Sequence, residues 1–246
     1  MSCPNAEAAV RTTHPASLAP SSRASSLATV AHDLRQPVSA ALVTADFLDE
    51  LLVTRAPVEV LRRYTALIRR SMHHALRLSN DLLTFGQLDS GTLLLDRGPT
   101  DVGALLHEVA QLLEADARSR RVTVHVSCGE MSRAHLDRHR MLRVLWNLCE
   151  NAVRHTPAGG DVHLSAGPDE MGIRIAVSDS GPGVDESQLT QLFDWYWQAD
   201  RVVHRSGAGL GLGIVRWLVE LHGGAVVAAN RPQGGLVVVL TLPAGQ

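Results

Sequence analysis

The chain of 246 residues has few cysteines and little net charge. Its three cysteines, Cys3, Cys128 and Cys149, have neither paired nor metal-ligand spacing, which excludes a disulfide framework or a cysteine-based metal site. We expect reduced thiols, with Cys149 packed in a core. The 23 basic and 25 acidic residues give a net charge of −2, which excludes an excess of positive charge for binding nucleic acid or an anionic membrane. Because an apolar run of about 18 residues and a signal-peptide core are both lacking, we expect no membrane span and a cytoplasmic location.

Length and composition indicate two modest domains. A chain of 246 residues exceeds one typical domain, and its 45% hydrophobic content is enough for a core in each. Residues 1–24 are rich in Ala, Ser and Pro with little apolar periodicity, which predicts a flexible arm. We expect a helical hairpin at 25–90 and a second domain of strands and helices at 91–246, so the predicted fold class is α+β.

The region after the arm has the periodicity of two long helices. From about Ser25 to Val53, apolar residues recur at spacings of three and four: Leu27, Val30, Leu34, Val38, Ala41, Ala45 and Leu48. Pro57 suits the first turn of a second helix, which continues to about Leu88. One partner helix cannot cover the apolar stripe of such a hairpin, so we expect a second copy to complete a dimeric four-helix bundle.

His32 and Asp33 are neighbours on the first of these helices. Adjacent helical positions point about 100° apart, so Asp33 cannot stack beneath the imidazole, but its carboxylate can curl round to one ring nitrogen. That contact would fix the tautomer and raise the basicity of the other nitrogen, as a nucleophilic histidine requires. The alternative is that His32, one of 12 histidines, lies on a solvated helix face. Pro37 is expected to bend or loosen the helix just after the pair.

Strands and helices are mixed in the second half of the chain. The pattern predicts helices at 105–117, 138–155 and 211–222, and strands at 121–126, 162–166, 173–179, 225–230 and 236–242, after a short apolar strand with a Gly/Pro break in the segment 90–102. This mixture suits one mixed sheet covered by helices on one face, an α/β sandwich.

Two asparagines, Asn147 and Asn151, are four residues apart on the helix predicted at 138–155 and so share a face. A magnesium ion bound to nucleotide phosphates takes oxygen ligands and keeps some waters, so a single amide oxygen is an adequate protein ligand. The alternative, on these residues alone, is that both asparagines line or cap an exposed helix face.

A first glycine-containing turn follows the strand predicted at 173–179. Asp179 ends that strand and enters Ser-Gly-Pro-Gly, whose glycines, Gly181 and Gly183, reach backbone angles closed to other residues and leave room for a planar ring. A carboxylate at the mouth of a sheet can accept a hydrogen bond from the exocyclic amine of adenine. A plain strand-ending turn would use the same residue types.

A second glycine-rich stretch, GAGLGLG, leads into the helix predicted at 211–222 and contains Gly207, Gly209, Gly211 and Gly213. Glycines there let backbone N–H groups approach phosphate oxygens, and the start of a helix adds partial positive charge. The stretch is not a P-loop, which needs Gly-Lys-Ser/Thr, nor a dinucleotide fingerprint, which would follow the first strand of a βαβ unit.

Five motifs in order resemble those of sensor histidine kinases and together cover nearly everything from about Ser25 onward. AHDLRQP resembles the H box, NLCENAVRHTP the N box, DSGPG the first glycine box, QLFDWYWQ the F box and GAGLGLGIV the second glycine box. The resemblance implies an ATP-dependent histidine autokinase of a two-component system, with ATP and Mg²⁺ bound in the second domain. It implies that His32 attacks the γ-phosphate with Asp33 as general base, and that the phosphoryl group passes to an aspartate of a response-regulator receiver domain.

The resemblance also assigns roles in the second domain. It makes Asn151 the magnesium ligand through ATP and Asn147 a supporting residue, and it brings Arg154 or His155 to the phosphates. It makes Asp179 the acceptor for the adenine amine; the other implied ATP-binding residues are Gly181, Gly183, Phe193, Gly207, Gly209, Gly211 and Gly213. The family implies a homodimer, and the signal would enter through the arm, an upstream sensor protein or a sensor portion absent from this chain.

The chain departs from the family in two boxes. In the F box, Trp195 and Tyr196 stand where Arg and Phe are common, and Gln198 where a basic residue is common. A missing cation could slow transfer, because phosphoryl transfer depends on neutralising charge on the moving group, although Arg201 or Arg205 could substitute. In the H box, Gln36 replaces the Thr or Asn tied in the family to dephosphorylation of the partner; an amide can still orient a water.

Two other classes of function remain open. A plain ATPase or serine kinase of the same nucleotide-binding superfamily would explain the second domain but not AHDLRQP. A non-catalytic dimeric scaffold, or a phosphotransfer protein that uses only His32, would explain the departures but make Asn151, Asp179 and the glycines superfluous.

Overall fold

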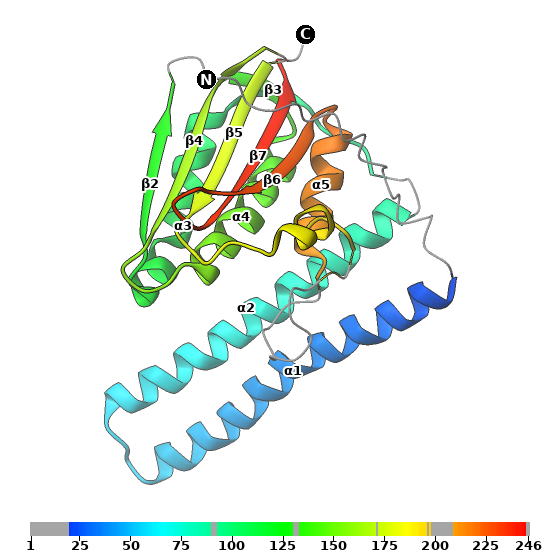
Figure 1. Ribbon diagram of the computed structural model, residues 1–246. Coiled ribbons are helices and arrows are strands. Elements are labelled where there is room, and N and C mark those ends of the chain that lie inside the picture. The colour runs from blue at the N-terminus through cyan, green and yellow to red at the C-terminus, as the bar shows by residue number, and fades with distance from the viewer. Residues whose placement is uncertain are drawn as a thin grey trace. The chain divides into compact units, whose positions relative to one another are not determined.

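The computed structural model describes residues 20–89, 93–129, 133–170, 172–195, 197 and 209–244, with only the backbone described at 20–30, 88 and 89 (Figure 1). The described residues fall into two compact units that divide between Gly91 and Thr92. Residues 1–19 of the expected arm lie outside the described part of the chain.

The first unit is the predicted helical hairpin. Helix α1 spans Pro20–Val53 and α2 spans Val58–Asp89. The start of α1 is a correction, because residues 20–24 were expected to belong to the arm; proline suits the first turn of a helix, where its missing N–H has no helical acceptor. The helix continues through Pro37 without interruption. Between the helices, Arg55 adopts a positive φ of 53° and the Ala56 N–H donates to Leu51 O at 2.9 Å, which closes the turn.

Much of the hairpin's apolar surface remains exposed. Five residues of the hairpin are buried: Pro37, Ala41, Ala75, Leu78 and Phe85. Val38, which the periodicity placed in the seam, is exposed instead, because Pro37 takes the buried position. The other large apolar side chains of the unit that remain exposed are Leu42, Val43, Phe47, Leu52, Val53, Val58, Leu67, Leu76 and Leu83. The hairpin alone therefore leaves unburied a surface that normally needs a partner.

The second unit contains the predicted mixed sheet. Its five strands lie in the order β2 (Thr123–Cys128), β4 (Asp161–Asp169), β5 (Gly172–Asp179), β7 (Leu236–Pro243) and β6 (Ala225–Asn230). Strands β2 and β4 are parallel and the other neighbours are antiparallel. A separate pair joins β1 (Gly98–Asp101) to β3 (Arg133–Leu136).

Three helices cover one face of the five-stranded sheet (Figure 1): α3 (Val102–Arg120), α4 (Arg138–His155) and α5 (Gly211–Leu221). Alternate residues of β5 point into this layer, where Ile173, Ile175 and Val177 are buried. Each fully buried side chain of this size contributes about 1.5–3 kcal/mol relative to its exposed state. Cys149 on α4 is buried as predicted, and burial raises the pKa of its thiol.

Two local predictions were wrong or incomplete. The segment 90–102 does contain a strand, but residues 93–95 of its apolar part form none; the strand lies at Gly98–Asp101, where a Gly/Pro break was expected and where β3 supplies an antiparallel partner. Neither β3 nor the short 3₁₀ helix at Glu186–Gln191 was predicted. Among the described residues, no helix has both the length and the apolar character needed to cross a membrane.

Candidate functional site

His32 lies on the surface of α1 with Asp33 beside its ring. The distance from His32 Nδ1 to Asp33 Oδ1 is 3.5 Å, and the two side chains are 65% and 20% exposed. The contact favours a proton on Nδ1, so the lone pair lies on Nε2, which has no partner among the described residues. Gln36 follows His32 by one helical turn on the same exposed face. His32 therefore presents an accessible ring nitrogen with an amide nearby.

Helix α4 brings Asn147 to the start of α5. Asp137 caps α4 by accepting the Arg140 N–H on Oδ1 at 3.0 Å, so the helix begins where the sequence predicted. Ten residues later Asn147 Nδ2 donates to Gly211 O at 3.2 Å, which joins the N box to the second glycine box. Asn151 is half-buried on the same face, and its amide has no partner among the described residues.

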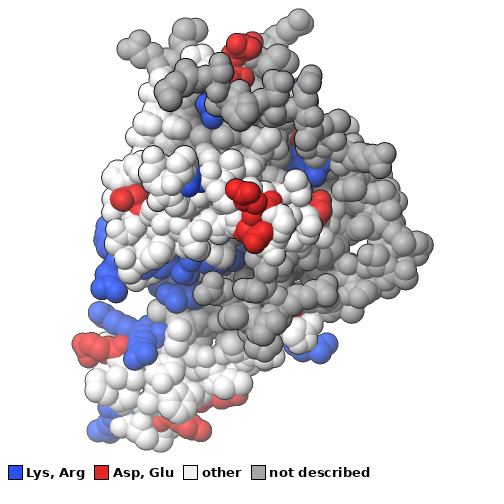
Figure 2. Space-filling model, viewed as in Figure 1, with Lys and Arg blue, Asp and Glu red and all other residues white. Residues whose placement is uncertain are grey.

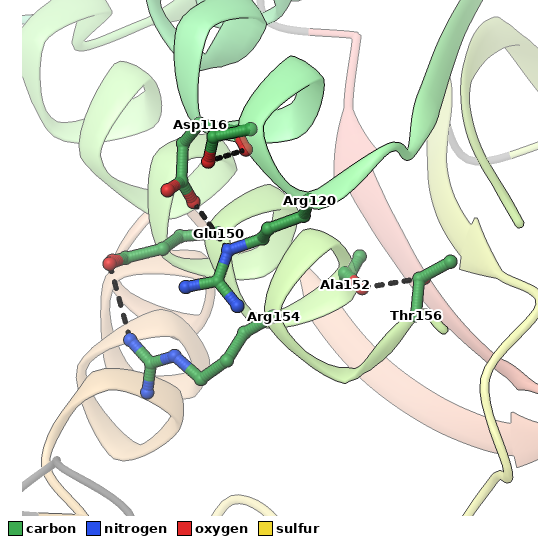
Figure 3. A network of polar contacts seen from close by, with 7 residues as sticks. Asp116, Arg120, Glu150, Ala152, Arg154 and Thr156 are labelled. Carbon is green, nitrogen blue, oxygen red and sulfur yellow. Dashed lines mark hydrogen bonds and ion pairs between the residues drawn. The ribbon is translucent and has the colours of Figure 1, made fainter. Parts of the chain in front are cut away.

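Arg154 is already paired within α4. Its Nη2 lies 3.2 Å from Glu150 Oε1, and the two side chains are 29% and 16% exposed. Figure 3 shows this ion pair beside the Asp116–Arg120 pair of α3. His155, at the end of α4, is exposed. Arg154 therefore has a carboxylate partner that any phosphate contact would have to replace or share.

Asp179 is a buried carboxylate at the end of β5. Its side-chain Oδ1 accepts the N–H of Gly181 at 2.8 Å and the N–H of Leu236 at 3.2 Å. Its Oδ2 has no partner among the described residues. Because a buried acceptor without a donor is costly, this oxygen is suited to a ligand that donates a hydrogen bond.

Neighbouring protein atoms explain why glycine stands at positions 181 and 183, after Asp179. A Cβ on Gly181 would lie 2.8 Å from Asp179 Oδ1 and 2.9 Å from His155 O, so a side chain there would push the N box and Asp179 apart. Gly183 has a φ of +74°, and a Cβ there would lie 2.6 Å from Asn230 Oδ1. Both glycines are therefore required by neighbouring protein atoms, a requirement that the sequence did not reveal.

The described glycines of the second glycine box differ in environment. Gly209 has a φ of +66°, which favours glycine. A Cβ on Gly211 would meet only the Asn147 amide, at 3.7 Å, whereas one on Gly213 would lie 2.9 Å from Trp195 Cε3. Gly207 lies outside the described residues. Of these three described glycines, only Gly213 lies against an aromatic ring that leaves no room for a Cβ.

The F box packs on α5 through two contacts. Phe193 is buried, and the ring of Trp195 lies over Gly213. On the next turn of α5, Arg216 Nη1 lies 3.9 Å from Asp194 Oδ1, and its Nε lies 2.9 Å from Glu220 Oε1. Trp195 thus acts here as a packing residue, which the sequence did not predict. Tyr196, Gln198, Arg201 and Arg205 lie outside the described residues.

The site therefore unites the N box, the first glycine box and the start of α5 in one unit, whereas His32 belongs to the other unit. The described residues contain no group of three or more His, Cys, Asp and Glu that could hold a metal ion. Both basic and acidic side chains lie on the described part of the face seen in Figure 2.

Family models match both units. Residues 22–91 match the His Kinase A (phospho-acceptor) domain, and residues 136–246 match the histidine kinase-, DNA gyrase B- and HSP90-like ATPase. The chain belongs to the sensor histidine kinases. Within that family it contains the core formed by the helical hairpin and the α/β ATP-binding fold.

Curated relatives support this placement. This histidine kinase is 34% identical over 216 residues to the alginate biosynthesis sensor protein KinB of Pseudomonas aeruginosa. The aligned region covers 86% of the chain and 35% of KinB. It is 30% identical over 227 residues to the signal transduction histidine-protein kinase BaeS of Escherichia coli, covering 88% of the chain and 46% of BaeS. The chain thus spans less than half the length of either relative.

Solved structures agree on the fold. Full-length ShkA in complex with AMPPNP matches 84% of the chain and 46% of ShkA with a TM-score of 0.64 and 30% identity. The catalytic domain of histidine kinase ThkA matches 61% of the chain and 97% of that domain with a TM-score of 0.56 and 27% identity.

Proposed function

We propose that the chain is an ATP-dependent protein-histidine kinase core that phosphorylates His32. In this proposal residues 25–90 form the phosphoacceptor hairpin and residues 91–246 the ATP-binding domain. The observation that carries the proposal is the buried Asp179 carboxylate, with Oδ1 held by two backbone donors and Oδ2 open to a ligand, in a chain that also exposes His32 beside Asp33. The similarity to ShkA, solved with AMPPNP, supports nucleotide binding in this fold.

The hydrogen bonds that Asp179 already accepts determine which nucleotide base it can recognise. Because Gly181 and Leu236 already donate to Oδ1, the carboxylate is oriented before any ligand arrives. The exocyclic amine of adenine can then donate to Oδ2, whereas the carbonyl oxygen that guanine has at that position cannot. Adenine nucleotides are therefore the proposed ligands.

The phosphates would lie toward α4 and the start of α5. The amide oxygen of Asn151 suits Mg²⁺, which prefers oxygen ligands and needs only one from the protein when phosphates supply others. When bound, the ion neutralises charge on the phosphates. Asn147 holds Gly211 and so supports the start of α5, and Arg154 would release or share Glu150 as it approaches a phosphate. His155 and the glycines of the second glycine box complete the proposed site.

Transfer to His32 uses the ring nitrogen that faces away from Asp33. The Nε2 lone pair forms a bond to the γ-phosphorus, the bond from that phosphorus to the oxygen of ADP breaks, and ADP leaves. The ring gains positive charge as it reacts, and the Asp33 carboxylate next to Nδ1 stabilises that charge and accepts the proton as general base.

The product suits onward transfer, because a P–N bond is labile. The proposed acceptor is an aspartate of a response-regulator receiver domain, and Gln36 would orient a water if the kinase also dephosphorylates that partner. The exposed apolar side chains of α1 and α2 favour a homodimer. An upstream sensor protein or segment would supply the signal, and the use of ATP points to the cytoplasm.

The test is phosphoryl transfer from γ-labelled ATP with magnesium to the chain. The parent should take up label that is lost in acid and kept in alkali, and His32→Gln should take up none. His73→Gln is the matched control, because His73 is an exposed helical histidine of α2 in the same unit. Label that resists acid would indicate a serine kinase, and ATP binding without label would indicate the scaffold; either result contradicts the proposal.

A further inference from the structure

The turn that joins β6 to β7 contacts the segment that carries Asp179. This turn runs from Asn230 to Leu236 and is closed by the Arg231 N–H, which donates to Gly235 O at 2.8 Å. Residues 180–185, after Asp179, have no helix or strand of their own. A segment without internal backbone hydrogen bonding must be ordered by contacts from outside, and the β6–β7 turn provides them at both ends.

At the first end, the turn fixes the main chain of Asp179. Arg231 Nη1 donates to the Asp179 main-chain oxygen at 2.6 Å. Gly235 packs against the same oxygen so closely that a Cβ there would lie 2.0 Å from it. The Leu236 N–H adds the bond to Asp179 Oδ1 at 3.2 Å. The backbone and one carboxylate oxygen of Asp179 are therefore both held by this turn.

At the second end, Asn230 binds Val184 in both directions. Asn230 Oδ1 accepts the Val184 N–H at 2.9 Å, and Asn230 Nδ2 donates to Val184 O at 2.6 Å. A side-chain amide thus acts on Val184 as a neighbouring strand would, because it satisfies the donor and the acceptor of one residue together. Asn230 can approach because Gly183 has no Cβ, which would lie 2.6 Å from Asn230 Oδ1.

The guanidinium of Arg231 binds the main chain of Asp179 and leaves the carboxylate oxygen Oδ2 open. The guanidinium donates to the carbonyl oxygen of Asp179, and Oδ2 has no partner among the described residues. A cation bound to Oδ2 would compete with a donor from a ligand. The turn therefore orients Asp179 while it leaves the oxygen proposed for adenine available.

From these contacts we propose that Asn230 and Arg231 are positioning residues for adenine recognition. They fix the segment 179–184 at its two ends and so set how well Asp179 selects an adenine base. This inference rests on the proposed function, since it assumes that a nucleotide base binds at Asp179.

The test compares the binding of ATP and inosine triphosphate, which has a carbonyl where adenine has its amine. The chain is titrated with each nucleotide in magnesium, and the ratio of the two dissociation constants is the readout. Asn230→Ala and Arg231→Gln should each reduce the preference for ATP by about fivefold or more, since misplacing one hydrogen bond to a charged group has an effect of this order. If a residue were needed only for stability, its substitution would weaken the binding of both nucleotides equally and leave the ratio of the two dissociation constants unchanged.

Matched controls come from the same turn and the same sheet. Gln233→Ala changes an exposed residue of the turn, and Arg174→Ala removes an exposed arginine of β5; both should keep the parent ratio. If Asn230→Ala or Arg231→Gln fails to fold, the milder Asn230→Asp, which keeps the acceptor for the Val184 N–H, and Arg231→Lys, which keeps the charge, should give intermediate ratios.

Two different failures can be distinguished. If the parent prefers ATP and every folded variant at Asn230 and Arg231 keeps that preference, the positioning role is overturned while the proposed function stands. If the parent does not bind ATP, the proposed function is overturned, and this inference with it.

Discussion

His32 Nδ1 lies 3.5 Å from Asp33 Oδ1, although the two residues are neighbours on one helix. The carboxylate thus reaches the ring from the side, as the sequence predicted, and leaves Nε2 as the accessible nitrogen. This relationship gives Asp33 a role that its amide analogue cannot fill, because an amide cannot accept the proton that leaves Nδ1.

The first prediction concerns Asp33. Asp33→Asn should slow phosphorylation of His32 by about 10²-fold, a typical contribution of a general base, and should leave ATP binding unchanged. The initial rate of labelling from γ-labelled ATP measures the effect. Asp46→Asn, an exposed aspartate of the same helix, is the control. Equal rates for Asp33→Asn and the parent would remove Asp33 from the mechanism.

The second prediction concerns Asp179. An asparagine there has one acceptor and one donor, so its NH₂ must face either the adenine amine or the Gly181 and Leu236 N–H groups. Asp179→Asn should therefore raise the dissociation constant for ATP by about tenfold to a hundredfold. Calorimetric titration measures the constant, and a thermal melt shows whether the variant is folded. Unchanged affinity in a folded variant would place the base elsewhere.

The third prediction separates two glycines of the second glycine box. Gly213→Ala should lower the free energy of unfolding by about 1–3 kcal/mol, because the new methyl group would overlap the Trp195 ring. Gly211→Ala should be neutral or stabilising by up to about 1 kcal/mol, because alanine favours a helix and has room there.

Urea unfolding measures both effects, and a second background identifies the cause. In a Trp195→Ala chain, Gly213→Ala should lose its penalty, since the overlapping ring is gone. A penalty that persists in that background would show that Trp195 is not responsible.

The fourth prediction concerns pH and the buried His222. Its Nδ1 and Leu218 O lie 2.7 Å apart, and the Asp137 N–H donates to its Nε2 at 3.1 Å, so the folded protein needs the neutral ring. Burial lowers the pKa of His222 from its usual 6.5, and nearby Arg97 lowers it further, while the Leu218 bond and Asp137 oppose the change. Below pH 6.5 the unfolded chain takes up a proton that the folded chain resists.

The free energy of unfolding should therefore fall as pH drops from 6.5 toward the lowered folded pKa of His222. Urea unfolding at a series of pH values measures the slope. His222→Gln, which can keep both hydrogen bonds without titrating, should show a shallower slope across that window. An equal slope in the two proteins would show that His222 does not contribute.

The sequence predicted best where a local pattern decides the structure. Helix α4 begins at Arg138 as expected because Asp137 is a good N-cap residue and the apolar spacing after it is regular. Strand β1 was expected within 90–102 but not at Gly98–Asp101, because these residues have little intrinsic preference for a strand and form one by pairing with β3.

The site, too, was predicted where a local motif decides the structure and missed where a distant contact decides it. The motifs predicted that Asn147, Asp179 and the glycines belong to one ATP site. The N box contacts both glycine boxes, through Asn147 and Gly211 and through His155 O and Gly181, and their role in binding ATP stays a prediction. Asn230 escaped notice because its partner Val184 is 46 residues away, and such a contact leaves no periodic signal in the sequence. The roles of Gly181 and Gly213 likewise depend on distant neighbours, His155 and Trp195.

The proposed kinase activity is tested most sharply by locating the phosphate on the chain. After incubation with ATP and magnesium, the protein is digested under alkaline conditions, which preserve a P–N bond, and the modified residue is identified by mass spectrometry. Phosphate should be found on His32 and on no other residue. Phosphate on a serine or threonine, on another histidine, or on no residue of a chain that binds ATP would contradict it.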